Sequence, residues 1–449
     1  MLIEFIIQNF LSFDNEQKIS MIPGKVRGKS QHLIKKNKIN LLSFSAIYGA
    51  NASGKSNLVR ALDFSREFIV NALPKGHNVM YNRTNGNNKE LPSKFEFKLN
   101  LKSGLFRYGY EVKLSTSSII SEWLYSMDKE SDTLIFSRNV LENKYILGKY
   151  LTKESAKNRI ELYLQDIKSQ DNVLFLTEIN RNKVSLYKEE PELKPFKDIF
   201  TWFDEGLDIN YPNRVFSDYS YFMTKSNSTE LCDTIKSFAT GITNFIIVDI
   251  IQDELREFIP KNLLEDIKEK INKSIIDAKK NNKKLDDVGL LLRGDDAFFI
   301  FEVDENEDII TRTIKFEHGK HGVFDISEES DGTRRLLELI EILFADNDNK
   351  TYVIDELDRC LHPLLTYKFI ERYLNSIQKR NIQLIVTTHE SRLLDLELLR
   401  RDEIWFVNKD QNGISEVYSL EDYNERFDKK IDKAYLGGRY RAIPHFDEV

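Results

Sequence analysis

Apolar residues along the chain follow two spacings, one typical of strands and one typical of helices. Residues 2–10 alternate or run apolar, and residues 41–49, LLSFSAIYG, form a short apolar run typical of a buried strand. Residues 57–73 then carry apolar side chains at helical spacing. Because a glycine-bearing loop at 49–56 joins these two segments, the pattern predicts strand, loop and helix in direct succession.

The rest of the chain changes pattern several times. Three alternating segments between residues 94 and 128 predict an antiparallel set of strands. From about 140 to 295 the pattern is mostly helical, most clearly at 263–285, and strand character returns between 297 and 318. An α/β succession then runs to about residue 420. We therefore predict an α/β fold in which a mixed sheet with helices is joined to an antiparallel β subdomain and a mostly helical insertion.

These changes of pattern predict four parts of the chain. The amino-terminal lobe takes residues 1–139, and the carboxyl-terminal lobe takes residues 301–420. Residues 140–300 form the insertion, which could serve oligomerisation or the docking of a partner, and residues 421–449 form a tail.

The loop at residues 49–56, GANASGKS, follows the pattern G-x-x-x-x-G-K-S that cradles nucleotide phosphates. In this pattern consecutive backbone N–H groups surround the phosphates, Lys55 reaches the terminal ones, and the Ser56 hydroxyl binds Mg²⁺. The start of the following helix adds the positive end of its dipole. A turn that matches by chance is the alternative, and the strand before and the helix after argue against it. The expected nucleotide contacts of this loop are Gly49, Asn51, Ala52, Ser53, Gly54, Lys55, Ser56 and Asn57.

Residues 350–358, KTYVIDELD, predict a buried strand that ends in two carboxylates. Asp355 would hold the water shell of the magnesium ion, and Glu356 would polarise the attacking water as a general base. The pair could be merely structural, but adjacent carboxylates at a strand end are costly unless a cation lies opposite them. A second apolar strand, within 382–391, leads to His389. Alone, such a histidine is more often a satisfied surface or core residue, whereas beside the other motifs it can contact the γ-phosphate as a sensor.

Residues 328–344 place Ser330, Asp331 and Gly332 directly before an amphipathic helix. A serine hydroxyl and a helix amino terminus offer an anion-binding site there, although the chain already has one at the phosphate loop. We therefore expect Ser330 and Gly332 to cap the γ-phosphate of a nucleotide that another subunit holds. The alternative is an ordinary N-cap, which Ser or Asp before a Leu-rich helix would satisfy.

The order of these motifs resembles that of ABC-type ATPase heads of the SMC/RecF/OLD kind. The opening MLIEFIIQNFLSF resembles their first strand, SDGTRRL (330–336) a divergent form of their signature motif, and LDRCLHP (357–363) the loop after their magnesium-binding strand. The resemblance implies an ABC-type ATPase head that binds ATP with Mg²⁺ and hydrolyses it. It also implies head-to-tail homodimers or larger assemblies, in which each ATP lies between one subunit's phosphate loop and the other subunit's signature serine.

Four further stretches resemble a compact prokaryotic group that is often linked to restriction and phage-defence loci. They are residues 95–112, SEWLY (121–125), LFLTEIN (174–180) and KAYLGGRYRAIPHF (433–446). This resemblance implies abortive infection, a separately encoded nuclease or Toprim-type effector, and a phage protein as trigger. The chain departs from the pattern at Leu11, where many relatives carry a basic residue, and residues 92–97 hold no glutamine that would monitor magnesium.

Composition limits the remaining functions. The formal net charge of −7 means that the whole molecule is not attracted to nucleic acid, so any such contact must use a local basic patch. Residues 25–38 carry six Lys or Arg and no acid, and residues 279–284 form a second basic run. Both could contact phosphate backbones or be solvated loops, and the lack of interleaved aromatic residues slightly favours solvated loops.

The sequence lacks the features of secretion and of membrane insertion. Cys232 and Cys360 follow neither a metal nor a disulfide spacing, which suits a reducing cytosol. The amino terminus has no basic start and no small-residue cleavage site, and no uncharged apolar run approaches the roughly 18 residues that span a membrane. We expect a cytoplasmic protein without a membrane contact.

Two functions stay open from the sequence. In the first, ATP closes a dimer or larger ring that holds a separate nuclease effector until a phage signal arrives. In the second, the protein is a RecF-like DNA repair or recombination ATPase that binds DNA directly. A built-in nuclease is disfavoured because only about 60 residues follow His389. A transport subunit is disfavoured because about 275 residues separate Lys55 from Ser330 without an apolar span.

Overall fold

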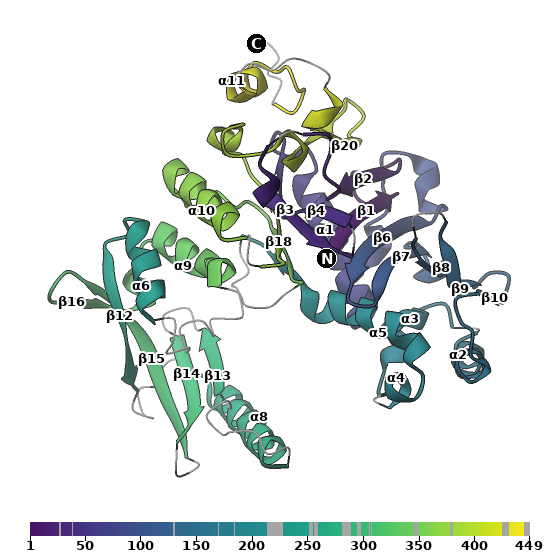
Figure 1. Cartoon of the computed structure of the whole chain (residues 1–449), viewed down its shortest axis with the longest axis horizontal. Coiled ribbons are helices and arrows are strands. Elements are labelled where there is room, and N and C mark those ends of the chain that lie inside the picture. Colours follow the sequence, from purple (N-terminus) through teal and green to yellow (C-terminus); the bar gives the residue numbers. More distant parts are fainter. Residues whose placement is uncertain are drawn as a thin grey trace. The chain divides into compact units, whose positions relative to one another are not determined.

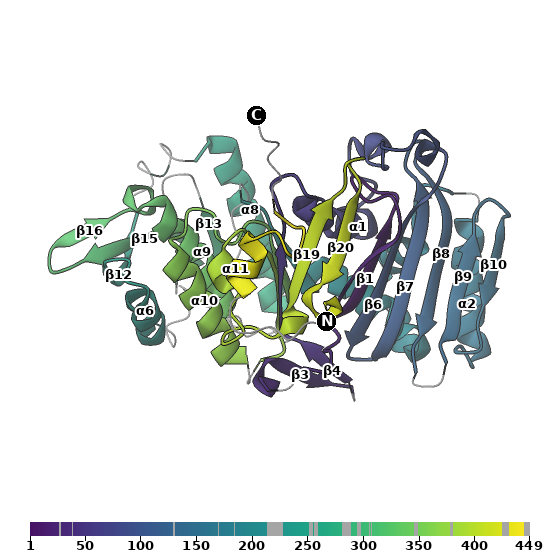
Figure 2. The same cartoon turned by 90° about the horizontal axis from the view of Figure 1, so that it is seen from above.

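A computed structural model gives the arrangement of the chain (Figures 1 and 2). It describes residues 1–449 except for single positions and short segments. The residues outside the description are 27, 38, 129–130, 169, 184, 213–227, 251–254, 256–258, 281–288, 294–297, 305, 307, 345–348, 378–379, 424–430 and 444–449. Arg27, most of the basic run at 279–284 and parts of the predicted tail therefore lie outside the described residues.

The chain folds into two compact units. The first unit takes Met1–Pro212, Asp346–Asp358 and Ile370–Val449, and the second takes Asn213–Ala345 and Arg359–Phe369. The boundaries of these units differ from those of the lobes, insertion and tail expected from the sequence. Residues 140–212, which were expected in the insertion, belong to the same unit as the amino-terminal part. The assignment of separate tasks to those four parts stays a prediction.

The first unit contains a six-stranded sheet in the order β11-β17-β18-β5-β19-β20. Its strands are β11 (Leu207–Asn210), β17 (Thr351–Ile354), β18 (Gln383–Thr387), β5 (Phe44–Tyr48), β19 (Ile404–Lys409) and β20 (Ser415–Ser419). The first five are parallel, and β20 runs antiparallel beside β19. Because parallel strands point the same way, the residues that follow β5, β17 and β18 meet at one edge of the sheet.

A second sheet in this unit is antiparallel, with seven strands in the order β10-β9-β8-β7-β6-β1-β2. Figure 2 shows the strands from β10 to β1 side by side. The strands are β1 (Leu2–Gln8), β2 (Gln17–Ser20), β6 (Ser93–Leu101), β7 (Gly104–Lys113), β8 (Ser118–Ser126), β9 (Thr133–Asn139) and β10 (Lys144–Leu147). A separate hairpin pairs β3 (Leu33–Lys36) with β4 (Ile39–Leu42). The alternating segments at 94–128 thus form adjacent strands of this sheet, as predicted.

Helix α1 (Lys55–Val70) packs against both sheets. Its buried residues Leu58, Leu62 and Phe64 share one apolar cluster with side chains from each sheet. The ring of Phe64 stacks on that of Phe95 in β6, with their centroids 5.2 Å apart. Burial of this apolar face holds α1 in place, and with it the loop that precedes it. The other helices of this unit are α2 (Glu154–Asp166), α3 (Phe175–Asn180), α4 (Leu186–Glu189), α5 (Lys194–Thr201) and α11 (Ile431–Leu436).

Glu122 in β8 joins two of the stretches that carry the family resemblance. Its fully buried carboxylate accepts hydrogen bonds from the backbone N–H groups of Phe175 and Leu176, at 2.7 and 3.0 Å. Arg138 Nε donates to it at 2.9 Å and Tyr108 Oη donates at 3.0 Å. Four donors satisfy this buried charge, so the stretches at 121–125 and 174–180 form a single structural contact.

The second unit contains a five-stranded antiparallel sheet with helices. The strands are β12 (Ile242–Asp249), β13 (Gly289–Arg293), β14 (Phe298–Val303), β15 (Ile309–His318) and β16 (Gly322–Phe324). The helices are α6 (Ser228–Ser237), α8 (Lys261–Lys280) and α9 (Asp331–Phe344), while α10 (Pro363–Ser376) contains residues of both units. Helix α8 packs Ile267 and Ile271 against Phe299 and Phe301 of β14.

The predicted α/β fold class, with a mixed sheet and an antiparallel β subdomain, is confirmed. The predicted strands at 297–305 and 309–318 correspond to β14 and β15. The region 140–300 also contains strands that periodicity did not indicate, such as β12. Since β12 reads ITNFIIVD, its apolar residues run together without clear alternation and do not distinguish a strand from a helix.

Candidate nucleotide site

The phosphate loop follows β5 directly and ends at α1, as predicted. Gly54 caps the helix in the left-handed region, at φ +115° and ψ 6°. A Cβ at Gly54 would lie 2.4 Å from Ser415 Oγ, and a Cβ at Gly49 would lie 2.4 Å from the carbonyl oxygen of Val407. Glycine is therefore required at both ends of the loop, because β19 and β20 approach its backbone too closely for a side chain.

Lys55 folds back onto its own loop. Its Nζ donates to Gly49 O at 2.8 Å and to Ala50 O at 3.0 Å, and only 5% of the residue is exposed. Burial lowers the pKa of Lys55 to about 8, and the carboxylate of Asp355 is the largest opposing influence. Among the described residues the amine bonds to these carbonyl oxygens and to no carboxylate, and an arriving phosphate would favour its charged form.

The other loop residues divide between exposed and buried positions. Asn51 and Ala52 are exposed at the tip, whereas Ser53 is buried and its Oγ has no hydrogen-bond partner among the described residues. Ser56 is half-buried in the first turn of α1. The side chain of Asn57 donates to Ser12 Oγ at 2.8 Å and so ties α1 to the turn after β1.

Asp355 and Glu356 follow the buried strand β17, as predicted. Asp355 is 4% exposed, and its Oδ1 accepts a hydrogen bond from Thr387 Oγ1 at 2.6 Å. The same Thr387 hydroxyl accepts from the backbone N–H of Glu356 at 2.8 Å. Glu356 has a left-handed φ of +52°, which is unfavourable for a residue with a Cβ and typical of functional sites.

Thr387 is a site residue that sequence reasoning missed. It ends β18, which pairs directly with β17, so its hydroxyl reaches the two residues that follow β17. The only signal in the sequence is the pair of threonines before His389.

His389 lies two residues beyond β18. Its backbone N–H donates to Asp358, at 3.2 Å to Oδ1 and 3.3 Å to Oδ2. Partial burial and the positive charge of Lys55 lower the pKa of His389, which favours the neutral form of the ring. Asp358, which sequence reasoning did not single out, thus positions the histidine. In the first unit, Lys55 and His389 lie near three carboxylates, those of Asp355, Glu356 and Asp358. The negative charges of these carboxylates partly oppose the lowering of the pKa of Lys55 and of His389.

Ser330 and Gly332 lie in the second unit, so the structure does not relate them to the phosphate loop. Ser330 Oγ accepts from the Thr333 N–H at 3.1 Å, which is the N-cap bond of α9. The residue is nevertheless exposed. A Cβ at Gly332 would lie 2.7 Å from the carbonyl oxygen of Cys360. Both residues line an open concavity of about 600 Å³, together with Thr240.

No group of three or more His, Cys, Asp or Glu side chains among the described residues could hold a metal ion alone. Magnesium at nucleotide sites usually takes one or two protein oxygens plus phosphates and water. The Ser56 hydroxyl and the Asp355 carboxylate could supply these one or two protein oxygens.

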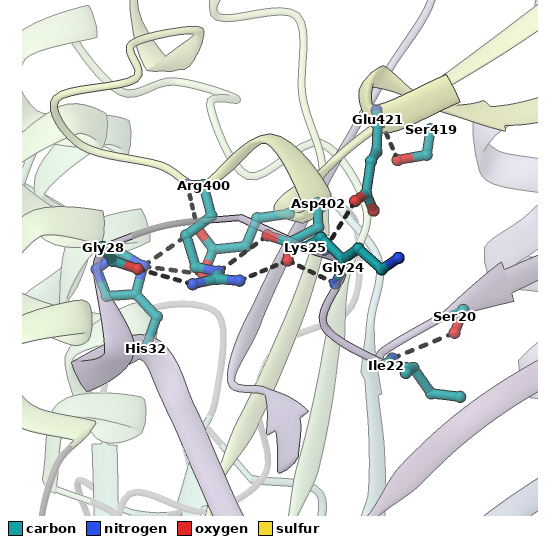
Figure 3. A network of polar contacts seen from close by, with 11 residues as sticks. Ser20, Ile22, Gly24, Lys25, Gly28, His32, Arg400, Asp402, Ser419 and Glu421 are labelled. Atoms are coloured by element: carbon teal, nitrogen blue, oxygen red, sulfur yellow. Dashed lines mark hydrogen bonds and ion pairs between the residues drawn. The ribbon is translucent and has the colours of Figure 1, made fainter. Parts of the chain in front are cut away.

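The basic stretch 25–38 is tied to the carboxyl-terminal part of the first unit (Figure 3). Just before it, the Gly24 N–H donates to Asp402 Oδ2 at 2.8 Å. The Lys25 N–H donates to Glu421 Oε1 at 3.0 Å. These bonds use backbone groups, so the side chain of Lys25 stays exposed.

Two lysines of this stretch have their ammonium groups bonded within the protein. Lys29 Nζ donates to the carbonyl oxygen of Leu396, and Lys36 Nζ donates to Asn349 Oδ1. Fewer cations therefore face solvent than the sequence suggests. Within the described part of the stretch, Lys25 and Lys35 are the exposed basic residues.

No helix in the described parts of the chain combines the length and the apolar character that crossing a membrane requires.

Three solved structures are similar to this chain at low identity. The SmcHead bound to the C-winged helix domain of ScpA is 14% identical, with a TM-score of 0.43, and the match covers 93% of this chain and 97% of that one. The SMC head domain from Thermotoga maritima is 12% identical, with a TM-score of 0.36 and coverages of 93% and 98%. The Smc head domain with an extended coiled coil, bound to the C-terminal domain of ScpA derived from Pyrococcus furiosus, is 12% identical, with a TM-score of 0.38 and coverages of 98% and 99%.

Comparison with curated proteins finds none that matches this sequence. A family model does match, over residues 44–220 and 252–395, which together make up well over half of the chain. The matched ranges include the phosphate loop, Ser330, Asp355 and His389. The chain therefore belongs to the family described as "AAA domain, putative AbiEii toxin, Type IV TA system".

Proposed function

We propose that the protein is an ABC-type ATPase that binds ATP with Mg²⁺ at the phosphate loop and hydrolyses it. The observation that carries this proposal is the convergence of Lys55 with Asp355, Glu356 and His389 at one edge of the parallel sheet. The fit of a nucleotide is supported by glycines where Cβ atoms would collide and by a buried Ser53 hydroxyl without a partner among the described residues.

Each residue then has a distinct task. Lys55 leaves the carbonyl oxygens of Gly49 and Ala50 and turns to the terminal phosphates, where its charge is stabilised. Ser56 and Asp355 would hold a magnesium ion, which would neutralise charge on the phosphates. Glu356 accepts the proton of the attacking water, and His389 contacts the γ-phosphate.

The contribution of a second subunit is also proposed. Ser330 and Gly332 cap the γ-phosphate of a partner protomer's ATP, so that ATP closes a head-to-tail homodimer or larger assembly. The exposed serine and the open concavity at the start of α9 support this proposal. Ser330 Oγ accepts from the Thr333 N–H at 3.1 Å and shares a second bond with Thr333 Oγ1 at 2.9 Å, so its proton is available to a phosphate when the Thr333 hydroxyl donates in that second bond.

In the cell, we propose a cytoplasmic switch of an antiviral defence system. ATP-driven closure holds a separately encoded nuclease or Toprim-type effector, which a phage protein releases in abortive infection. The family description, which names a toxin of a toxin–antitoxin system, supports a defence role. The competing proposal is a RecF-like ATPase that binds DNA directly, supported by the exposed Lys25 and Lys35.

Nucleotide binding is the first test. Wild-type protein should bind a non-hydrolysable ATP analogue with Mg²⁺, and Lys55→Ala should bind it at least tenfold more weakly. Lys102→Ala, on the exposed turn after β6, is the matched control and should bind like wild type. Equal binding by wild type and Lys55→Ala would overturn the proposed site.

The role in a second subunit has its own test. Ser330→Arg should leave analogue binding intact and block hydrolysis, because the bulky side chain would separate the two subunits. Hydrolysis of ATP by Ser330→Arg at the wild-type rate would contradict the head-to-tail arrangement. Tight DNA binding by the isolated protein, lost on replacing Lys25 and Lys35, would favour the RecF-like proposal.

A further inference from the structure

Ser415 begins strand β20 and lies against the phosphate loop. The residue is fully buried, and its hydroxyl donates to the carbonyl oxygen of Ser53 at 2.6 Å. Its backbone N–H donates to the carbonyl oxygen of Ser12, in the turn after β1, at 2.8 Å. A residue 362 positions further along the chain than Ser53 therefore bonds directly to the backbone of the loop.

The hairpin that carries Ser415 has a well-bonded turn. Asp410 Oδ1 accepts hydrogen bonds from the N–H groups of Asn412 at 3.0 Å and Ile414 at 2.7 Å, a pattern typical of an aspartate that closes a turn. The first strand of the hairpin, β19, pairs in parallel with β5, which leads into the loop. The turn and this pairing together fix the position of Ser415 relative to the loop.

The α-carbon of Gly54 lies between Ser415 and Ser12. A Cβ at this position would lie 2.4 Å from Ser415 Oγ and 2.8 Å from Ser12 Oγ. Ser12 Oγ in turn accepts a hydrogen bond from Asn57 Nδ2 of α1 at 2.8 Å. The turn after β1, the start of β20 and the first turn of α1 thus meet at the peptide group that joins Ser53 to Gly54.

The bond from Ser415 determines how this peptide group is oriented. Because a peptide bond is planar and trans, its carbonyl oxygen and its N–H point in opposite directions. With the Ser53 carbonyl oxygen held by Ser415, the N–H of Gly54 points away from the Ser415 hydroxyl. An N–H group at the start of a helix has no carbonyl partner within that helix, so the Gly54 N–H can donate to an anionic ligand.

We propose that Ser415 is a positioning residue of the phosphate loop, whose hydroxyl holds the peptide group between Ser53 and Gly54 with its N–H toward the nucleotide phosphates. This inference rests on the proposed nucleotide function. Ser415 touches no reacting atom in this account, since it acts only through the loop backbone. Without its hydroxyl the peptide group can rotate, which removes one N–H from the phosphates and does not alter the groups that carry out hydrolysis.

The test compares Ser415→Ala with Ser419→Ala. Each variant removes one hydroxyl from a buried position of β20, but Ser419 Oγ accepts from the N–H of Glu421, which is not part of the loop. Binding of a non-hydrolysable ATP analogue with Mg²⁺ should weaken about two- to tenfold in Ser415→Ala, as expected for one neutral hydrogen bond, and less than about twofold in Ser419→Ala. The turnover number at saturating ATP should stay within about twofold of wild type in both variants, so the change appears in KM.

A second measurement needs no nucleotide. The N–H of Ser53 donates to Ala50 O at 3.2 Å, next to the peptide group that Ser415 holds. Amide hydrogen exchange in a fragment that covers residues 50–58 should be several times faster in Ser415→Ala than in wild type, because the freed peptide group loosens this turn. Exchange in the same fragment should be unchanged in Ser419→Ala.

The outcomes separate the contact from the proposed function. Wild-type affinity in Ser415→Ala would overturn the inference, as would equal losses of affinity in both variants, because a general loosening of β20 would then explain them. Failure of the wild type to bind nucleotide would instead reject the proposed function. The exchange result would then still judge the contact, since wild-type exchange in Ser415→Ala would show that its hydroxyl does not hold the loop.

Discussion

Replacing Thr387 with valine tests whether one hydroxyl organises the catalytic edge of the sheet. Thr387 is fully buried, and its Oγ1 joins Asp355 Oδ1 at 2.6 Å to the Glu356 N–H at 2.8 Å. Valine has nearly the same shape but removes both bonds. Asp355 then loses a fixed orientation toward the magnesium site, and Glu356 loses the bond that holds its backbone.

The magnitude follows from these two bonds. A hydrogen bond to a charged group contributes about 1.5–3 kcal/mol, and a left-handed φ costs an ordinary residue about 1–2 kcal/mol. Without the Thr387 hydroxyl, Glu356 can relax from φ +52° toward a more favourable backbone conformation, which moves its carboxylate. Since each 1.36 kcal/mol changes a rate tenfold, the turnover number should fall about 10- to 150-fold.

The assay measures ATP turnover and analogue affinity side by side. Affinity should change less than about threefold, because Lys55 and the loop backbone make no contact with Thr387 in this account. Thr388→Val is the control, since Thr388 is equally buried and, within the described parts of the chain, its Oγ1 accepts from the Glu390 N–H at 3.0 Å and bonds neither Asp355 nor Glu356. Wild-type turnover in Thr387→Val, or an equal loss in Thr388→Val, would refute the reasoning.

Three further predictions concern the loop and its supports. Gly54→Ala should abolish analogue binding, because its Cβ would collide with Ser415 Oγ, whereas Gly76→Ala, also at positive φ but with open space, should bind normally in the same titration. His32→Leu should lower the free energy of unfolding by about 1–3 kcal/mol in denaturant melts, since it removes the hydrogen bond between His32 Nδ1 and the buried Glu403 carboxyl group, and an unchanged midpoint would contradict this. With a Lys55 pKa of about 8, binding should take up a proton between pH 8 and 9 and weaken as pH rises, and calorimetry in two buffers should detect no uptake in Lys55→Arg.

The phosphate loop and the carboxylate pair were predictable because their signals are local. Gly49, Gly54, Lys55 and Ser56 stand at fixed spacing within one strand–loop–helix unit. A buried apolar strand before Asp355 is equally visible in the sequence.

Thr387 could not be predicted in the same way. Its role arises from the sheet order β17-β18-β5, which places segments that are distant in sequence beside one another. A threonine shortly before a histidine is common, so this pattern does not indicate a contact by itself. The strand β12 was missed because its continuous apolar run fits a helix as well as a strand.

The central claim is that Lys55 holds the nucleotide and Glu356 is needed to hydrolyse it. The most direct measurement follows labelled ATP and Mg²⁺ through a single turnover on wild-type and Glu356→Gln protein. The account predicts that Glu356→Gln binds ATP as tightly as wild type and keeps it uncleaved at least a hundredfold longer. Cleavage at the wild-type rate by Glu356→Gln would contradict the account, because the general base would then lie elsewhere.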